Sequence, residues 1–427
     1  MKRLLATFMF ALATFPSFVH AQIETDQLTL DGPLFDDSLE DVHTIRVIGD
    51  YTFLVDHIDR GSYEEKRLYR QSTENPNAVG LVFAAEGNLD ADDDMIEFND
   101  ALYFTLTTAD GITLYQSTDD GTTWEEKKTF TVKDTAISLK DLIITPQRLY
   151  VIAQSTTTTP TSLIAVLSTS NGDDWHKKVL RKHNPQYVAT QILEDTPYLF
   201  ANLSYTTGTE EAPMTKYRSV VYSPLTPNGK KFIPAGLGNY NGNLPIKSVQ
   251  EVVSFNDTLF ISGYINPSLD AESLTKRSNW RTLRSTNGVV WRSAGGKFTD
   301  FVNHQSTLFT HDKNQVYYTT TGETFTPINF SFESEIDMVD HSLTLFGSAD
   351  TGLLFASMQE NSTNSDDEAT VVDRCLVSRD AVTWFDDDCM IADKAAPRQV
   401  SKFDSFWYFV RGRNQTSYNL YSLTFNK

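Results

Sequence analysis

Cysteine is almost absent from this chain of 427 residues, which contains two, and its eight histidines are scattered. Neither type forms the Cys/His spacing of a zinc site or the His-Glu-x-x-His pair of a metalloprotease. There is no Gly-x-Ser-x-Gly elbow, and the glycine-rich run at 236–242 lacks the context of a nucleotide-binding loop. These absences exclude the catalytic classes that sequence reveals most readily, and we expect no cofactor. Paired carboxylates for glycoside hydrolysis stay open, because the two acids of such a site can come from distant parts of a chain.

Positive charge is also scarce. The chain has 36 Lys and Arg against 56 Asp and Glu, which gives a net charge of −20 and a pI near 4.8. A face that binds DNA or RNA would carry a basic stripe, so we expect no nucleic acid partner. Asp90, Asp92 and Asp94 are spaced like the opening of a calcium loop but lack the glycine and distal Glu of an EF-hand. We predict a solvated loop and no metal site, with weak Ca²⁺ binding as the alternative.

Long apolar runs are missing after the first 21 residues. Residues 1–21 carry Lys2 and Arg3, then an apolar stretch and Val19-His20-Ala21, a pattern typical of a signal peptide cleaved before Gln22. No later run is long enough to span a bilayer. We therefore predict a signal peptide at 1–21 and one exported domain at 22–427, either periplasmic or extracellular. Nothing in the pattern predicts an oligomeric state.

The two cysteines, Cys375 and Cys389, are equidistant from residue 382 at the turn of a predicted hairpin. Opposed positions on a hairpin come close enough to be bridged, and an exported chain meets an oxidising compartment. We predict a disulfide between them.

What the chain does contain is a recurring hairpin motif, which we call the box hairpin. Its best copy is Ser117-Thr118-Asp119-Asp120-Gly121-Thr122-Thr123-Trp124. Glycine accepts the positive φ of a tight turn, Asp accepts hydrogen bonds from the turn's amides, and Trp packs the hairpin onto the neighbouring sheet. Gapless copies run over Ser168–Trp175, Arg284–Trp291, Tyr318–Phe325 and Leu225–Phe232, and eroded copies over Ser72–Val79 and Val377–Trp384. The residues expected to hold these hairpins structurally are Ser117, Asp119, Gly121, Trp124, Gly172, Trp175, Gly288, Trp291 and Trp384.

Apolar anchors recur between the hairpins with a mean period of about 51 residues, which is typical of four-stranded propeller blades. The anchors are Phe53, Tyr103, Tyr150, Leu199, Phe260, Phe309, Leu354 and Trp407. We predict an all-β, β-propeller domain with eight four-stranded blades. Seven blades are the alternative, if a first strand near Leu345 and Leu354 is mistaken for a second. Asp26–Leu30 should pair with Ser417–Phe425 in the last blade and close the ring.

The copy at Ser117–Trp124 resembles the Asp-box (BNR) repeat Ser-x-Asp-x-Gly-x-Thr-Trp at every defining position. Through its copies the whole of 22–427 resembles the Asp-box β-propeller superfamily. That superfamily includes sialidases, whose Arg-Ile-Pro motif corresponds here to Thr44-Ile45-Arg46-Val47-Ile48, with the arginine kept and the proline absent. It also includes propellers similar to photosystem assembly factors and sortilin-type receptors, which are binding platforms. The resemblance implies a propeller fold and leaves both activities open.

Loop lengths indicate a functional face. Insertions at 205–217, 266–280 and 361–373, and the inter-blade loops 86–94 and 234–245, should share the face opposite the box hairpins. We expect Tyr205, Tyr240 and Trp280 to contact a ligand there, although the Trp280 indole is as well suited to packing.

Five cationic side chains are predicted near the starts of first strands: Arg46, Lys140, Lys247, Lys297 and Arg398. They either form an anion pocket at the channel mouth or pair with carboxylates such as Glu97 and Glu251. We predict a non-catalytic binding or assembly module for a protein or glycan. The alternative is a sialidase-like or other glycoside hydrolase acting from the loop-rich face.

Overall fold

The structure, a computed structural model, is built almost entirely of antiparallel β-sheet. The residues it describes are 20–24, 28–31, 42–72, 79–87, 94–156, 162–181, 184–209, 212–224, 232–234, 244–267, 277–304, 306–313, 315–331, 343–348, 353–363, 369–378, 383–386, 399–403, 406–413 and 417–425. Among them, no helix is long and apolar enough to cross a membrane.

Six sheets contain four strands each and follow a simple antiparallel order. Five of them are continuous meanders along the chain. The first two sheets contain β3 (Val42–Ile48), β4 (Tyr51–Asp59), β5 (Glu64–Ser72) and β6 (Val79–Glu86), and then β7 (Met95–Phe98), β8 (Ala101–Thr108), β9 (Gly111–Ser117) and β10 (Glu125–Phe130). The next two contain β11 (Ile137–Thr145), β12 (Arg148–Ser155), β13 (Ile164–Thr169) and β14 (His176–Leu180), and then β15 (Pro185–Leu193), β16 (Thr196–Thr209), β17 (Ala212–Pro224) and β18 (Phe232–Pro234). The fifth contains β19 (Ser248–Phe255), β20 (Thr258–Tyr264), β21 (Trp280–Ser285) and β22 (Arg292–Ser293), with a 3₁₀ turn η1 (Arg277–Asn279) before β21.

The sixth sheet joins the two ends of the chain. Its strands are β31 (Gln399–Phe403), β32 (Phe406–Arg413), β33 (Ser417–Phe425) and, on its edge, β2 (Leu28–Asp31). β2 runs antiparallel to β33, with Leu28 opposite Phe425. The expected pairing of an N-terminal strand with Ser417–Phe425 is therefore present, but the strand begins two residues later and ends one residue later than the predicted Asp26–Leu30.

A seventh, nine-stranded sheet contains two further four-stranded meanders. One is β23 (Thr299–His304), β24 (Thr307–Asp312), β25 (Gln315–Thr319) and β26 (Thr326–Ser331); the other is β27 (Thr344–Ser348), β28 (Leu353–Thr363), β29 (Ala369–Ser378) and β30 (Thr383–Asp386). β1 (His20–Glu24) lies between them, parallel to both β26 and β30. Leu345 and Leu354 lie on the first and second strands of one meander, so the two apolar runs near them are distinct strands.

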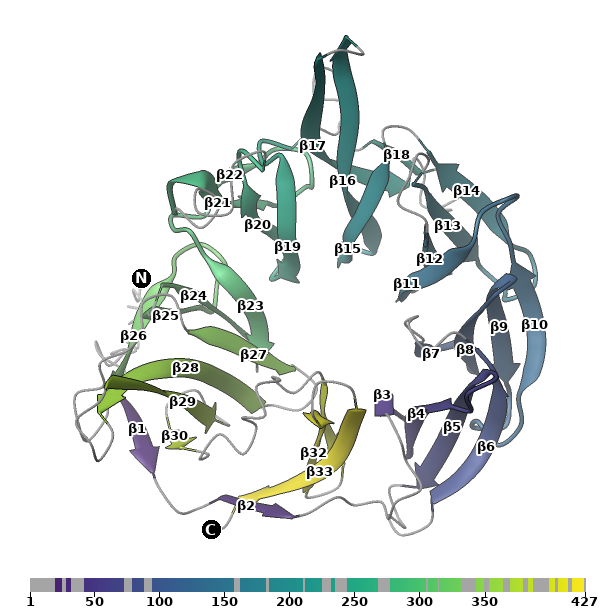
Figure 1. The fold of residues 1–427 in the computed structure, drawn as a ribbon, viewed down its shortest axis with the longest axis horizontal. Helices are drawn as coiled ribbons and strands as arrows, with labels where there is room; N and C mark the ends of the chain where they lie inside the picture. The colour runs from purple at the N-terminus through teal and green to yellow at the C-terminus, as the bar shows by residue number, and fades with distance from the viewer. Residues whose placement is uncertain are drawn as a thin grey trace, which may run out of the picture.

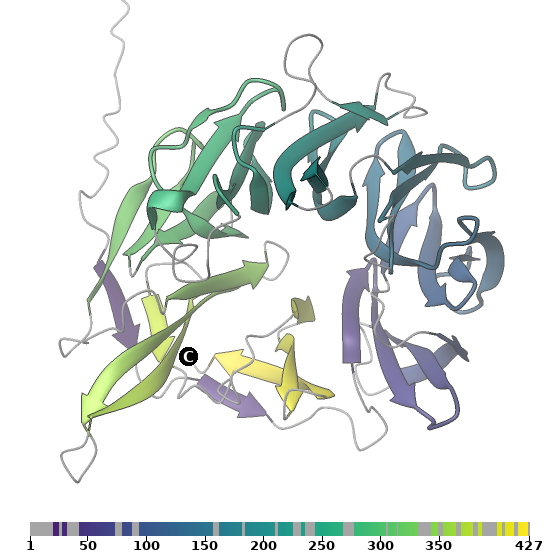
Figure 2. The same cartoon turned by 45° about the horizontal axis from the view of Figure 1, so that its top comes forward.

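The sheets are arranged in a ring, with the first strands β3, β7, β11, β15, β19, β23 and β27 innermost (Figure 1). In the tilted view, the purple strand β2 lies beside the yellow C-terminal strands (Figure 2). The core clusters join side chains of neighbouring meanders: Phe53 and Val55 of β4, for example, pack with Phe104 and Leu106 of β8. This arrangement of four-stranded sheets is consistent with a β-propeller.

The hairpin at Ser117–Trp124 has the geometry that its residue types predict. Gly121 has a φ of 78°, and its amide donates to Ser117 Oγ at 2.9 Å. Asp119 Oδ1 accepts the Thr123 amide at 2.9 Å, and this bond is the main reason that the pKa of Asp119 falls to about 2. Trp124 Nε1 donates to the Gly121 carbonyl at 3.1 Å, so the indole and the turn hold each other in place.

The other described box hairpins are one residue tighter than the gapless comparison with Ser117–Trp124 predicts. Their glycine amides bond to Thr169 Oγ1 and Thr319 Oγ1, each at 2.9 Å, and Ser285 occupies the same position in the third copy. The capping hydroxyl is thus not at the first position of the predicted copies, Ser168, Arg284 and Tyr318. The reason is that Ser117–Trp124 contains an additional turn residue, Asp120, at a φ of 54°.

Box residues also join neighbouring sheets. The rings of Trp124 and Trp291 meet Phe53 and Phe200 of the preceding sheet edge to face, at centroid distances of 6.5 and 6.1 Å. Trp384 is fully buried between the two meanders of the nine-stranded sheet. The turns of the copies at 72–79, 225–232 and 377–384 lie outside the described residues.

Two predicted loop insertions are strand extensions instead. Residues 205–209 and 212–217 continue the β16–β17 hairpin, which extends beyond the rim of the ring (Figure 1). Residues 361–373 continue β28 through Thr363 and β29 from Ala369. Thr and Tyr in the first segment, and Thr and Val in the second, favour extended backbone, which the loop-length comparison overlooked.

Candidate functional site

The inner wall of the ring is shaped by β-bulges. The first strands β3, β11, β15, β19 and β23 each shift register once against their second strands. In three of these strands a carboxylate lies at or directly after the shift: Asp141, Glu251 and Asp300. A bulge re-aims the side chains that follow it, so the same backbone irregularity places each acid against the next sheet.

Polar side chains of the preceding sheet hold these bulged strands. Gln154 Oε1 accepts the Tyr187 amide at 2.8 Å. Asn202 pairs with both backbone groups of Val249, accepting from its amide and donating to its carbonyl at 2.9 Å each. The bulges thus serve as joints between successive sheets.

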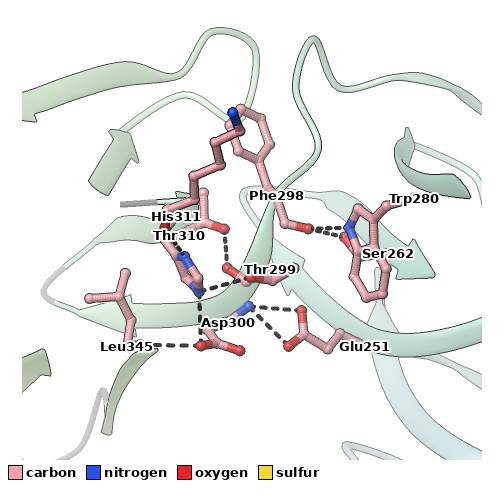
Figure 3. A network of polar contacts seen from close by, with 10 residues as sticks. Glu251, Ser262, Trp280, Phe298, Thr299, Asp300, Thr310, His311 and Leu345 are labelled. Carbon is pink, nitrogen blue, oxygen red and sulfur yellow. Dashed lines mark hydrogen bonds and ion pairs between the residues drawn. The ribbon is translucent and has the colours of Figure 1, made fainter. Parts of the chain in front are cut away.

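The most connected joint links β19, β23, β24 and β27 (Figure 3). Both carboxylate oxygens of Glu251 accept the Asp300 amide at 2.9 Å, and Asp300 has a φ of 53°. The Asp300 carboxylate accepts the Leu345 amide of the next meander at 3.2 Å. Three successive meanders are therefore tied together by two acidic residues.

His311 completes this network from β24. Its Nε2 lies 3.0 Å from Asp300 Oδ2 and 2.8 Å from Thr299 Oγ1, and its Nδ1 lies 2.9 Å from the Lys313 carbonyl. Burial, assisted by the nearby Asp300, raises the pKa of Glu251 to about 8. Burial is the largest influence on the pKa of Asp300 and acts to raise it. The hydrogen bonds with His311, Glu251 and the Leu345 amide, together with the charge of His311, outweigh burial, so the pKa lies below its usual range. Near neutral pH the joint therefore holds a protonated Glu251 beside an ionised Asp300.

A second polar group lies on β3, β7, β11 and β15. Arg46 Nη2 and Nε lie 2.8 and 2.9 Å from Asp94 Oδ1. The Tyr187 hydroxyl donates to Asp141 Oδ2 at 2.6 Å, while burial raises the pKa of Asp141 to about 6. Arg46, Asp94 and Asp141 line an open pocket of about 730 Å³ together with Asn99 and apolar first-strand side chains.

A larger pocket of about 830 Å³, which we call the loop-face pocket, lies at the opposite end of the strands, between the β3–β6 and β7–β10 sheets. Tyr63, on the turn between β4 and β5, is 45% exposed beside it. Exposed carboxylates and threonine hydroxyls complete the lining: Glu86, Asp110, Glu126, Thr113 and Thr129. Sequence reasoning missed Tyr63, because its turn is not an insertion.

Trp280 does not have the partly exposed indole that a ligand contact needs. It begins β21, is 9% exposed, stacks edge to face on Tyr264 and donates from Nε1 to the Phe298 carbonyl at 2.9 Å. The packing alternative is the correct one, because the preceding turn η1 brings the indole between two sheets.

The other predicted ligand residues do not converge. Arg46 uses its guanidinium on Asp94, Lys247 is exposed at the start of β19, and Tyr205 lies on the β16–β17 extension beneath the Arg218 guanidinium. Tyr240, Arg398, Cys389, Asp90 and Asp92 lie outside the described residues, so the disulfide stays a prediction. Within the described part, no group of His, Cys, Asp and Glu is arranged to hold a metal ion.

No family model and no curated protein matches the chain. Among solved structures it is similar to the polysaccharide lyase Uly1, with 9% identity, coverage of 79% of this chain and 90% of that one, and a TM-score of 0.46. It is also similar to the β-propeller domain of the Trilobed protease from Pyrococcus furiosus, with 8% identity, coverage of 79% of this chain and 95% of that one, and a TM-score of 0.41. A third similar structure is the N11 neuraminidase-like protein of A/flat-faced bat/Peru/033/2010, with 10% identity, coverage of 84% of this chain and 96% of that one, and a TM-score of 0.35. These similarities are too weak to assign a class of protein. The class, an all-β chain of propeller-like sheets, is assigned from the observed strand order of the sheets.

Proposed function

We propose that this protein is an exported, eight-bladed Asp-box β-propeller that acts as a non-catalytic binding module for a glycan, or for a protein. Eight blades are supported by the six four-stranded sheets together with the two meanders of the nine-stranded sheet. Closure of the ring through β2 is supported by its pairing with β33. Cleavage before Gln22 would leave Gln22–Glu24 of β1, the part that pairs with β30.

The observation that carries a non-catalytic role is the use of the inner-wall acids as joints. Asp141 is bonded to the Tyr187 hydroxyl, Glu251 to the Asp300 amide, and Asp300 to His311 and to the Leu345 amide. A glycoside hydrolase needs two carboxyl groups that face the scissile bond across a gap of about 5–10 Å. Carboxyl groups that are bonded to neighbouring sheets are poorly placed to face a scissile glycosidic bond.

The loop-face pocket has the chemistry of a sugar site. An exposed tyrosine offers an apolar ring face and a polar hydroxyl. Carboxylates accept hydrogen bonds and donate none when ionised, so they suit the hydroxyl groups of a sugar. Glu86 and Asp110 have no ion pair or hydrogen bond within the described residues, which leaves their oxygens available.

Binding to an immobilised glycan panel, followed by titration calorimetry with the best oligosaccharide, tests this proposal. We expect Tyr63→Ala and Glu86→Gln to weaken binding at least tenfold, about 1.4 kcal/mol. The matched control is Tyr217→Ala, which removes another exposed tyrosine, on the β16–β17 extension. Equal losses in Tyr63→Ala and Tyr217→Ala, or a wild type that binds no glycan, would count against the site.

One observation favours the alternative, a glycoside hydrolase. Glu251, protonated near neutral pH, lies beside the ionised Asp300, and a general acid beside a carboxylate is the pair such enzymes use. A panel of chromogenic glycosides that includes a sialoside tests it. We expect no turnover. Sialoside cleavage that disappears in Arg46→Lys, since lysine cannot reproduce the guanidinium fork, would establish the hydrolase instead.

A further inference from the structure

A third pocket, which we call the box-face pocket, opens at the end of the strands opposite the loop-face pocket. It has a volume of about 560 Å³ and lies among the β15–β16 and β19–β20 turns and the box hairpins after β21 and β25. Because the first turn and the box hairpin of a meander share one end of its strands, this site is independent of the sugar site proposed above.

Two arginines face each other across the hairpin at this pocket. Arg284 on β21 is directly opposite Arg292 on β22. Like charges at opposed positions destabilise a sheet. Arg284 donates from Nη1 to the Gly322 carbonyl at 2.8 Å, and within the described residues Arg292 has no hydrogen bond or ion pair. The pair therefore offers a guanidinium fork to an anionic group.

The tip of the same hairpin is unusually apolar. Val289 and Val290 are 38% and 55% exposed, whereas the hairpins at Gly121 and Gly172 have Thr-Thr and Asp-Asp after the glycine. The Val289 and Val290 amides both donate to Asn287 Oδ1, at 3.0 and 2.9 Å, so the valines are held outward by the turn. Val290 lines the pocket beside Arg292.

The remaining lining limits the charge of the ligand. Glu194, Asp257 and Glu323 surround the arginine pair, and their carboxylates repel a polyanion. They accept hydrogen bonds, so they favour a ligand with N–H donors next to its anionic group. One carboxylate, adjacent amide N–H groups and an apolar side chain occur together at the end of a polypeptide.

We propose that the box-face pocket binds the free C-terminus of a peptide whose last residue is apolar. The Arg284–Arg292 pair holds the terminal carboxylate through charge-assisted hydrogen bonds. Val290 contacts the last side chain, and the surrounding carboxylates accept the peptide N–H groups. Capture of a C-terminal carboxylate is an established mode of peptide recognition.

Fluorescence polarisation with fluorescein-labelled pentapeptides that end in Leu, Ile, Val or Phe tests this proposal. We expect the free acids to bind, and C-terminal amidation to weaken binding at least tenfold. Arg292→Ala and Val290→Asp should cause losses of the same size. Arg281→Ala is the matched control, because Arg281 lies on β21, the strand of Arg284, but donates to the Ser278 and Trp280 carbonyls and does not line the pocket.

Thermal melts of each variant establish that it is folded, and all substituted side chains are at least partly exposed. Three outcomes overturn the proposal: equal binding of the acid and amide forms, no binding of any pentapeptide by folded wild type, or equal losses in Arg292→Ala and Arg281→Ala. Binding of glucuronate without the peptides would assign the pocket to an acidic sugar instead.

Discussion

At the scale of single residues, glycine in the box hairpins serves a contact as well as a turn. Gly172 has a φ of 81°, and a Cβ built on it would lie 2.2 Å from the Tyr103 hydroxyl of the preceding sheet. Gly121 and Gly288 meet Phe53 and Tyr198 in the same way. The absence of a side chain at these glycines therefore allows the aromatic ring of the preceding sheet to approach the turn. The turn motif alone does not predict this need for a small residue.

Gly172→Ala should lower the free energy of unfolding by roughly 2–4 kcal/mol, through backbone strain and the clash with Tyr103. Gly295→Ala is the control, because Gly295 has a φ of 91° but no atom within 4 Å of the added Cβ; we expect a cost of about 1 kcal/mol there. Urea denaturation measures both. Tyr103→Phe should recover part of the loss in Gly172→Ala, and equal costs at the two glycines would refute the contact.

Glu251 gives the protein a pH dependence. Its pKa rises from 4.5 to about 8 on folding, so its stabilising contribution is complete below pH 4.5 and is lost as the pH rises through 8. Glu251→Gln should therefore flatten the decline in stability between pH 5 and 9, and exceed the wild type at pH 9 by an amount on the order of 2 kcal/mol. Chemical denaturation across this range measures it.

The exposed Glu97→Gln is the control for this series and should leave the pH profile unchanged. An unaltered slope in Glu251→Gln would mean that the carboxyl is not held in its protonated form.

Sequence reasoning was least successful at the residue scale. Trp280 could be assigned to binding or to packing, because only its neighbours Tyr264 and Phe298 decide between them. Glu251 was predicted only as a possible partner of the first-strand cations, and Asp300 was not singled out. Their convergence depends on bulges, and a one-residue insertion in a strand has no reliable sequence signal.

At the scale of elements, the joints between sheets can be tested one at a time. Asn202→Ala leaves the Val249 carbonyl without its Asn202 donor, so we expect a loss of about 1–3 kcal/mol in the free energy of unfolding. Gln250→Ala removes the longer contact, 3.3 Å, that an exposed side chain makes with the same carbonyl, and it should cost less than 0.5 kcal/mol, as most surface substitutions do. Similar values for the two variants would show that the Asn202 joint is unimportant.

Strands and box hairpins were predictable because their signals are local. Glycine, Asn-Gly and a terminal aromatic mark each turn, and the eight anchors all lie on second strands of the meanders. The capping hydroxyl was misplaced by one residue in three copies, because the comparison allowed no gap. The β16–β17 extension was missed because Thr-rich polar sequence is compatible with both a loop and a solvated strand.

At the scale of the whole molecule, the N-terminal segment is the test. Deleting residues 22–32 removes β2 from β33 and the remaining part of β1 from β30. We expect a lower thermal midpoint by several degrees, as follows from a loss of a few kcal/mol in a large domain. Circular dichroism melts measure it, and an unchanged midpoint would contradict a shared last blade. The repeat period predicted the overall architecture, since each repeat needs its neighbours to bury its faces.

The pairing of β2 with β33 also has a kinetic consequence. The segment at Leu28–Asp31 is synthesised before strands β3–β32, yet its partner at Ser417–Phe425 is synthesised after them. Until then an apolar strand must stay unpaired while the intervening meanders fold, and so long-range a contact forms slowly. An unpaired strand edge is also a route to aggregation. Folding should therefore end with the pairing of β2 and β33, which makes this pairing the step where a chaperone would help most.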